Sequence, residues 1–415
     1  MFLLLPQIRF RNLVATAVAA TLALLLAGRA DAQTMPGMTM MHHAPARACQ
    51  SAQPLGCADA ATPVFAPDGT LLLAWTQDQK VYFARSKDLG QSWTLPVRVG
   101  NANPGFDGGG DARPQLVADA AGHVLIAYDT FKDQQWNAQI WLASSSDGGA
   151  HFDAPRVFEP AAVSQRLPVL DVAASGKILM VWQDKRLSGP RKLPGASIAY
   201  AWSADGGRTF SPSALAANTS CECCRIAVTN APNGSPILAF RTIFPGEVRD
   251  HVILRFLPSG APDKPQRVSV DDWVTDACPH QGPSIAVSAN GTVNVAWYTQ
   301  GKARQGLFYA RSARGGAAFG EPQRLGNPDD ATSRPFVFAH GDQVWRVWKA
   351  FDGHVSQVLV QHSRNDGRDW SAPAVIDSAT GRSDHPLLTG NKDHVFLSWL
   401  SSEHGYQFIE LKDAQ

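Results

Sequence analysis

The chain has 415 residues, of which 37 are Lys or Arg and 36 are Asp or Glu, giving a formal net charge of +1 at pH 7. A balance this close to zero offers no basic surface of the kind that binds nucleic acid, so we expect no nucleic-acid partner. No composition shift along the chain indicates a second folded domain.

Residues 1–32 have the pattern of a secretory signal. Arg9 and Arg11 form a basic region, residues 13–27 form an apolar run, and residues 30–32 form a small-residue cleavage site. A membrane anchor is the alternative, but the apolar run is short for a span and ends directly at Arg29 and Asp31. A lipoprotein would require a cysteine at the cleavage site, and this site contains none, which argues against a lipoprotein. We predict export to the periplasm or the cell exterior, with no transmembrane segment after cleavage.

Methionine and histidine are concentrated in the segment that follows, the start of a predicted N-terminal region over residues 33–61. Thioethers and imidazoles are ligands suited to copper, and the segment resembles the Met/His-rich stretches of bacterial periplasmic copper-handling proteins. The alternative is a disordered tail without function. The candidate ligands are Met35, Met38, Met40, Met41, His42 and His43.

Cys49 and Cys57 come next and flank a segment containing Pro54 and Gly56. In an exported protein, two cysteines separated by a short turn-like segment are expected to form a local disulfide. A metal-binding pair is the weaker alternative.

From residue 62 to residue 412 the chain repeats a unit of four strand candidates. The second strand of each unit is apolar and ends in an aromatic residue, a pattern typical of a buried strand. We expect these aromatics to pack between neighbouring units. They are Trp75, Tyr128, Trp182, Phe240, Trp297, Trp348 and Trp399.

A second repeated motif, Ser-x-Asp-x-Gly-x-x-aromatic, follows most third strands. It is intact at residues 86–93, 145–152 and 203–210, weaker at 312–319 and 363–370, and absent from the fourth unit. The Ser and Asp side chains can bond nearby backbone N–H groups, glycine supplies a positive φ, and the aromatic is expected to fold back over the turn. This is a turn motif and not a catalytic one.

These boxes resemble those of the Asp-box (BNR-repeat) β-propellers, of which sialidases are the best-known members. The resemblance implies an all-β propeller of four-stranded blades. Seven second strands favour seven blades, with the six-bladed sialidase form as the alternative. The seventh unit supplies only three strands, so we expect residues 44–61 to add the missing one and avoid an open edge.

Cationic residues stand where each blade's first strand begins. First strands surround the axis of a propeller, so these side chains should meet at a central funnel, where they can bind a small anionic ligand. The alternative is that each Arg bonds backbone carbonyls of a neighbouring blade. The predicted funnel residues are Arg113, Arg166, Arg225, Arg334 and His385, with Gln281 at the matching place in the fifth unit.

Two adjacent blade entries also carry four cysteines and a histidine, namely Cys221, Cys223, Cys224, Cys278 and His280. Equivalent positions on neighbouring blades should bring them together, and thiolates with a nearby imidazole suit Cu(I) or Zn(II). Structural disulfides, such as Cys224 to Cys278, are the alternative in an oxidising compartment. Covalent haem is not expected, because Cys-x-x-Cys-His is absent.

Three functions follow as hypotheses. The first is an exported, non-enzymatic propeller that binds a metal, with copper as the favoured ion and another periplasmic or outer-membrane protein as a candidate partner. The second is an exo-sialidase or related glycosidase. One feature argues against it: the sialidase family places an Arg-Ile-Pro motif ahead of the first box, and this chain has Ala-Thr-Pro at that place, residues 61–63. The third is a scaffold that binds carbohydrate or protein.

Overall fold

The computed structural model describes residues 55–100, 105–161, 163–188 and 193–412. Within these ranges the chain forms seven antiparallel sheets and no helix. None of the described residues forms a helix able to cross a membrane.

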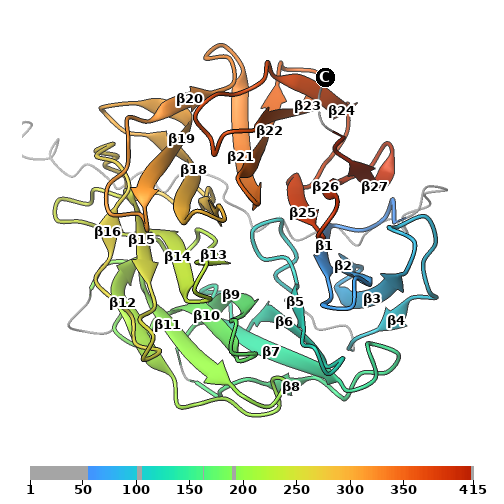
Figure 1. Cartoon of the computed structure of the whole chain (residues 1–415). Helices are drawn as coiled ribbons and strands as arrows, with labels where there is room; N and C mark the ends of the chain where they lie inside the picture. Colours follow the sequence, from blue (N-terminus) through green and yellow to red (C-terminus); the bar gives the residue numbers. More distant parts are fainter. Residues whose placement is uncertain (1–54, 101–104, 162, 189–192, 413–415) are drawn as a thin grey trace, which may run out of the picture. The chain divides into compact units, whose positions relative to one another are not determined.

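The sheets follow one another along the chain and form the blades of a β-propeller, arranged in a ring in Figure 1. Blade one contains β1 (Ala60–Phe65), β2 (Leu71–Gln77), β3 (Lys80–Ser86) and β4 (Val97–Arg98). Blade two contains β5 (Gln115–Ala118), β6 (Val124–Phe131), β7 (Ala138–Ser145) and β8 (Arg156–Val157). Blade three contains β9 (Gln165–Val172), β10 (Ile178–Asp184), β11 (Ala196–Ser203) and β12 (Ala214–Ser220). Blades four and five contain β13 (Ala227–Asn230), β14 (Pro236–Arg241), β15 (His251–Arg255), β16 (Gln266–Arg267); and β17 (Ser284–Val287), β18 (Thr292–Gln300), β19 (Gln305–Arg314), β20 (Gln323–Leu325). Blades six and seven contain β21 (Ala331–His340), β22 (Gln343–Phe351), β23 (Ser356–Ser363), β24 (Ala374–Ala379); and β25 (Leu387–Gly390), β26 (Val395–Ser401), β27 (Gly405–Glu410).

Seven blades close the ring. Each first strand contacts the first strand of the next blade, from β1 to β5 and onward, and β25 contacts β1. The predicted all-β propeller with seven blades is confirmed. The six-bladed alternative is wrong, because every one of the seven units takes a place in this closed ring.

The seven aromatics that end the second strands fill the interfaces between blades. Trp182 packs with Leu125 and Ile140 of the preceding blade, and Trp297 packs with Ile237 and Ile253 of the blade before it. Trp75 packs with Leu400 of the seventh blade and so belongs to the interface that closes the ring. The expectation of an inter-blade core is confirmed for this set.

The boxes form the turn that their sequence predicts. At the first box, Ser86 Oγ donates to Asp88 Oδ1 at 2.7 Å, and the Gly90 N–H donates to Ser86 Oγ at 2.8 Å. The Ser92 N–H donates to Asp88 Oδ1 at 2.8 Å. The same bonds recur at the boxes that begin with Ser145 and Ser203, where Asp147 and Asp205 accept.

The box aromatics do more than cover their own turn, which corrects the expectation from sequence. Phe152 meets Phe83 of the preceding blade with ring centroids 5.3 Å apart, and Trp370 meets Tyr309 at 5.0 Å. The fourth unit lacks the box, yet its Phe256 still contacts Tyr200 of the preceding blade at 5.0 Å. Phe256 directly follows β15, at the place of the box serine, so in the fourth unit a residue at another position makes the aromatic contact with the preceding blade.

The described part of the N-terminal region supplies no fourth strand for the seventh blade. β1 begins at Ala60, and Leu55 and Ala58 pack against Leu400 and Tyr406 of the seventh blade without joining its sheet. Residues 44–54, the rest of the predicted closing strand, lie outside the described ranges.

Replacing Asp88 with Ala should lower the melting temperature at pH 7, because the Ser92 and Ser86 hydrogen bonds are lost. These bonds lower the pKa of Asp88 from 3.8 to about 2. A depressed folded-state pKa stabilises the fold above the unfolded-state value, and this stabilisation is lost as the pH falls through the folded-state value. Calorimetry of Asp88→Ala from pH 7 to pH 3 should therefore show the gap to wild type narrowing at the acidic end. Gln91→Ala is an exposed control in the same turn, and a gap that is independent of pH would contradict the assignment.

Candidate functional site

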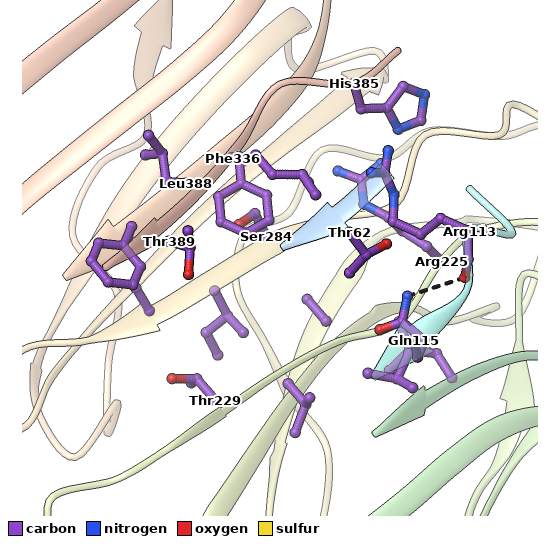
Figure 2. A pocket seen from close by; sticks show the side chains of 18 of the residues that line it. Thr62, Arg113, Gln115, Arg225, Thr229, Ser284, Phe336, His385, Leu388 and Thr389 are labelled. Atoms are coloured by element: carbon purple, nitrogen blue, oxygen red, sulfur yellow. Dashed lines mark hydrogen bonds between the residues drawn. The ribbon is translucent and has the colours of Figure 1, made fainter. Parts of the chain in front are cut away.

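The seven first strands enclose an axial channel of about 560 Å³. Its walls are mainly apolar, from residues such as Leu116, Ile285 and Phe336. Figure 2 shows Arg113, Arg225 and His385 at one end and Thr229 and Thr389 at the other. We call the end with Arg113, Arg225, Arg334 and His385 the channel mouth.

A glycine-rich loop over residues 105–112, before β5, brings two carboxylates to this region. Asp107 and Asp111 stand on either side of three consecutive glycines. At Gly110 an added Cβ would lie 2.8 Å from both Asp384 Oδ1 and His385 Nε2, so only glycine allows the backbone to pass this close. The absence of a side chain at Gly110 therefore lets the loop backbone come this close to the mouth.

Asp111 is the central anion of the mouth. It accepts from Arg225 Nη1 at 3.1 Å and from Arg334 Nη1 at 2.7 Å, and its Oδ1 lies 4.0 Å from His385 Nδ1. Burial, with the positive charges of Arg334, Arg113 and Arg225, holds the pKa of His385 well below its usual range. His385 is therefore neutral at pH 7, and Asp111 balances one of the two positive charges of Arg225 and Arg334, so this set keeps a formal charge of +1.

Local backbone distortion aims Arg334 at the mouth. The register of β21 against β22 shifts between Ser333 and Phe336, and Arg334 has a φ of 57°. Pro335 has no N–H to donate to the ladder, so the pairing is interrupted here and the bulge redirects the side chain.

Arg113 is buried and holds the ring closed. It donates from Nη2 to Asp384 Oδ1 at 2.8 Å and from Nη1 to the Ala61 carbonyl at 2.7 Å, and Asp384 also accepts from the Ala61 N–H at 3.2 Å. Three blades, the first, second and seventh, meet in this set of bonds. The contacts of Arg113 therefore fit the alternative interpretation from the sequence, in which each Arg bonds a backbone carbonyl of a neighbouring blade.

Arg166 also has an internal partner. It donates to Asp107 Oδ2 at 2.6 Å and stacks over Phe131, and it is not among the residues found to line the channel. Arg113, Arg225, Arg334 and His385 do line it. The sequence analysis missed Asp107 and Asp111, although two Asp residues flanking Gly108-Gly109-Gly110 ahead of a predicted first strand were a usable signal.

The cysteines of the two adjacent blade entries come together as expected. The sulfur atoms of Cys221, Cys223 and Cys224 lie within 4.8 Å of one another, and so do the ligand atoms of Cys223, Cys278 and His280. The Cys224 and Cys221 sulfurs are 3.0 Å apart, and those of Cys221 and Cys223 are 3.7 Å apart. All four cysteines are free thiols, so the alternative Cys224–Cys278 disulfide is not formed. We call these five residues the thiol cluster.

Three arginines hold the loop that carries Cys278 and His280. Arg249 donates to the Ala277 carbonyl at 3.1 Å, Arg241 donates to the Gln281 carbonyl at 2.9 Å, and Arg334 donates to the His280 carbonyl. The backbone of this loop is therefore fixed on both sides of its two candidate ligands. Arg334 connects it directly to the channel mouth.

The surroundings act differently on the thiols of the cluster. A hydrogen bond with Cys223 lowers the pKa of the Cys278 thiol, hydrogen bonds with Cys221 and Cys224 raise the pKa of the Cys223 thiol, and burial raises the pKa of the Cys224 thiol. Hydrogen bonds with Cys223 and Cys224, together with the charges of Arg241 and Arg249, hold the pKa of the Cys221 thiol well below its usual range. Arg249 Nη1 lies 3.9 Å from the Cys221 sulfur. Arg241 Nε and Nη1 and Arg249 Nε are buried and find no acceptor within the described part of the chain. Arg249 is also paired with Glu247, its Nη2 lying 3.5 Å from Glu247 Oε2, so a thiolate at Cys221 would be a second negative partner for this guanidinium.

The channel's other carboxyl group, Asp171, lies near the far end. Burial raises its pKa to about 6. It stands at the opposite end of β9 from Arg166, and at about 3.3 Å per residue this is roughly 16 Å along the strand. Carboxylates that cooperate in glycoside hydrolysis lie about 5 to 9.5 Å apart, so Asp171 is poorly placed to pair with the acids of the mouth.

Several predicted residues fall outside the described ranges. These include the whole Met/His segment from Met35 to His43, as well as Cys49. Cys57 is disulfide-bonded, but its pairing with Cys49 remains a prediction.

Comparison with known proteins finds similarity at the level of fold. No family model matches the chain, and no curated protein matches its sequence. Among solved structures, an ulvan lyase of polysaccharide lyase family PL25 aligns with a TM-score of 0.59 at 10% identity, covering 86% of this chain and 93% of that one. Polysaccharide lyase Uly1 aligns with a TM-score of 0.52 at 10% identity, covering 89% and 95%. A Hadza microbial sialidase gives 0.51 at 15% identity, covering 86% and 66%. The chain shares its propeller fold with these glycan-active enzymes.

Replacing Arg113 with Ala should destabilise the protein by about 3–5 kcal/mol, because Asp384 is left buried without its charge partner. Urea unfolding followed by tryptophan fluorescence measures the change. Arg368→Ala, at an exposed position, is the control and should stay within about 0.5 kcal/mol of wild type. If Arg113→Ala stays within the same range, the closure role is wrong.

Proposed function

We propose that this protein binds a soft metal ion, with Cu(I) as the favoured ion, through the thiol cluster. The observation that carries the proposal is the convergence of four free thiols and one imidazole from two neighbouring blades. Cysteine thiolates select Cu(I), and an imidazole is compatible with the same ion.

Charge supports a metal–thiolate assembly at this place. Three thiolates around one Cu(I) carry a net negative charge, and the positively charged Arg249 has its Nη1 3.9 Å from the Cys221 sulfur. The Met/His segment, Met35 to His43, would act as an outer capture site in the exported protein, delivering the ion to the cluster.

Reduced protein titrated with Cu(I), supplied as its bicinchoninate complex under anaerobic conditions, should take up one ion per chain. A variant with Ser at positions 221, 223, 224 and 278 should lose this uptake, since a hydroxyl is a poor ligand for Cu(I). Its circular dichroism and melting temperature verify the fold. Uptake by this variant equal to wild type, or no tight uptake by wild type, would sink the copper proposal.

Glycan cleavage is the second candidate, because structural neighbours of this fold are glycan-active enzymes. The mouth argues against the sialidase version of this function. Arg225 and Arg334, which a substrate carboxylate would need, already bind Asp111. No Tyr or Glu of the described residues lines the channel to act as nucleophile or its partner.

We therefore predict no release of a fluorogenic leaving group from an α-sialoside by the wild-type protein. The physical reason is that the transition state would lack both carboxylate anchoring and a nucleophile. The measurement is fluorescence over time with a known sialidase as positive control. Turnover that disappears in Arg334→Ala would establish the enzyme function instead.

A further inference from the structure

We infer that the thiol cluster is two overlapping sites that share Cys223: an exposed entry site formed by Cys223, Cys278 and His280, and a buried retention site formed by Cys221, Cys223 and Cys224. An ion taken up at the entry site passes inward by ligand exchange around Cys223. This inference rests on the proposed metal-binding function and adds how the ion reaches its final position.

Burial separates the two sites. Cys221, Cys223 and Cys224 are 0%, 2% and 1% exposed, so a hydrated ion has no direct access to their sulfur atoms. Cys278 and His280 are exposed. Each set of three has its ligand atoms within 4.8 Å of one another, and no such set among the described residues joins Cys278 to Cys221 and Cys224. Cys223 is the one ligand common to both.

The entry ligands are held in place by backbone contacts, which leaves their side chains available. The carbonyls of Ala277, His280 and Gln281 accept from Arg249, Arg334 and Arg241. His280 has a φ of 48°, in the left-handed region that non-glycine residues adopt uncommonly. A loop fixed in this way presents Cys278 and His280 to solvent beside the buried sulfur atoms.

Charge gives the transfer a direction. Cu(I) at the entry site has two thiolates and a neutral imidazole, for a formal charge of minus one. At the retention site it has three thiolates and a charge of minus two, which the guanidinium of Arg249 stabilises with its Nη1 3.9 Å from the Cys221 sulfur. The low dielectric of the interior strengthens that attraction, so the ion is held more tightly inside.

The exchange balances without any redox step. The bonds from Cu(I) to the Cys278 sulfur and a His280 ring nitrogen break, while bonds to the Cys221 and Cys224 sulfurs form. The bond to Cys223 persists. Protons released by the inner thiols leave to buffer, a proton returns to the Cys278 sulfur, and copper remains Cu(I) throughout.

Stopped-flow transfer of Cu(I) from its bicinchoninate complex to reduced, full-length protein tests the inference. The double variant Cys278→Ser/His280→Ala should take up the ion at least about tenfold more slowly but reach the same final stoichiometry, tenfold being the scale on which loss of a positioned group alters a metal site. His354→Ala, an exposed histidine in the β22–β23 hairpin, is the matched control and should behave as wild type.

The reciprocal variant isolates the entry site. Cys224→Ser should keep fast uptake but release Cu(I) to excess bathocuproine at least about tenfold faster than wild type, because the retention site has lost one thiolate. X-ray absorption should report three sulfur ligands in wild type and a mixed sulfur and nitrogen shell in Cys224→Ser.

The outcomes separate this inference from the function on which it rests. If wild type takes up no Cu(I), the metal-binding function fails. If wild type binds and the Cys278→Ser/His280→Ala variant is as fast, the entry site is wrong while metal binding stands. If that variant instead lowers the final stoichiometry, all five residues form a single site and the relay is overturned.

Discussion

Closure of the ring is the constraint on which the rest of this structure depends. Seven sheets can surround a channel only if the last packs against the first, and here that junction combines Trp75 in the interface core with the buried Arg113–Asp384 pair. The Ala61 backbone takes part through both its N–H and its carbonyl. Losing one such buried charge partner or one interface tryptophan costs about 3–5 kcal/mol, so the junction has contributions of similar size from packing and from charge.

Closure also determines which charges remain available for function. Arg113 and Arg166 bind Asp384 and Asp107, and Asp111 binds Arg225 and Arg334. Each of these four arginines thus has a carboxylate partner in the chain itself, with Asp111 shared by two of them. Beside the mouth, near the thiol cluster, Arg241 Nε and Nη1 and Arg249 Nε are buried and lack acceptors within the described residues, and this contrast directs attention to the cysteines.

The blades and the entry loops have separate tasks. Aromatic contacts between blades recur whether or not the polar box survives, as Phe256 shows in the fourth unit. The segments that enter the first strands differ from blade to blade, and they carry the thiols, the imidazole and the acids of the mouth. A rigid scaffold with variable loops is a common way to place functional groups, which is why the shared fold does not decide the activity.

The sequence by itself determined the class of fold, the number of blades and the residues that build each interface. Repeated local patterns carry that information, because a box turn or an apolar strand with a terminal aromatic is specified within a few residues. It also placed Cys223 and Cys278 together, since equivalent positions on adjacent repeats must be neighbours. Only the tertiary structure decided which charged groups at the channel mouth pair with one another. Asp111 meets Arg225 and Arg334 across more than one hundred residues of chain, and no local pattern encodes a contact that exists only once the ring has closed.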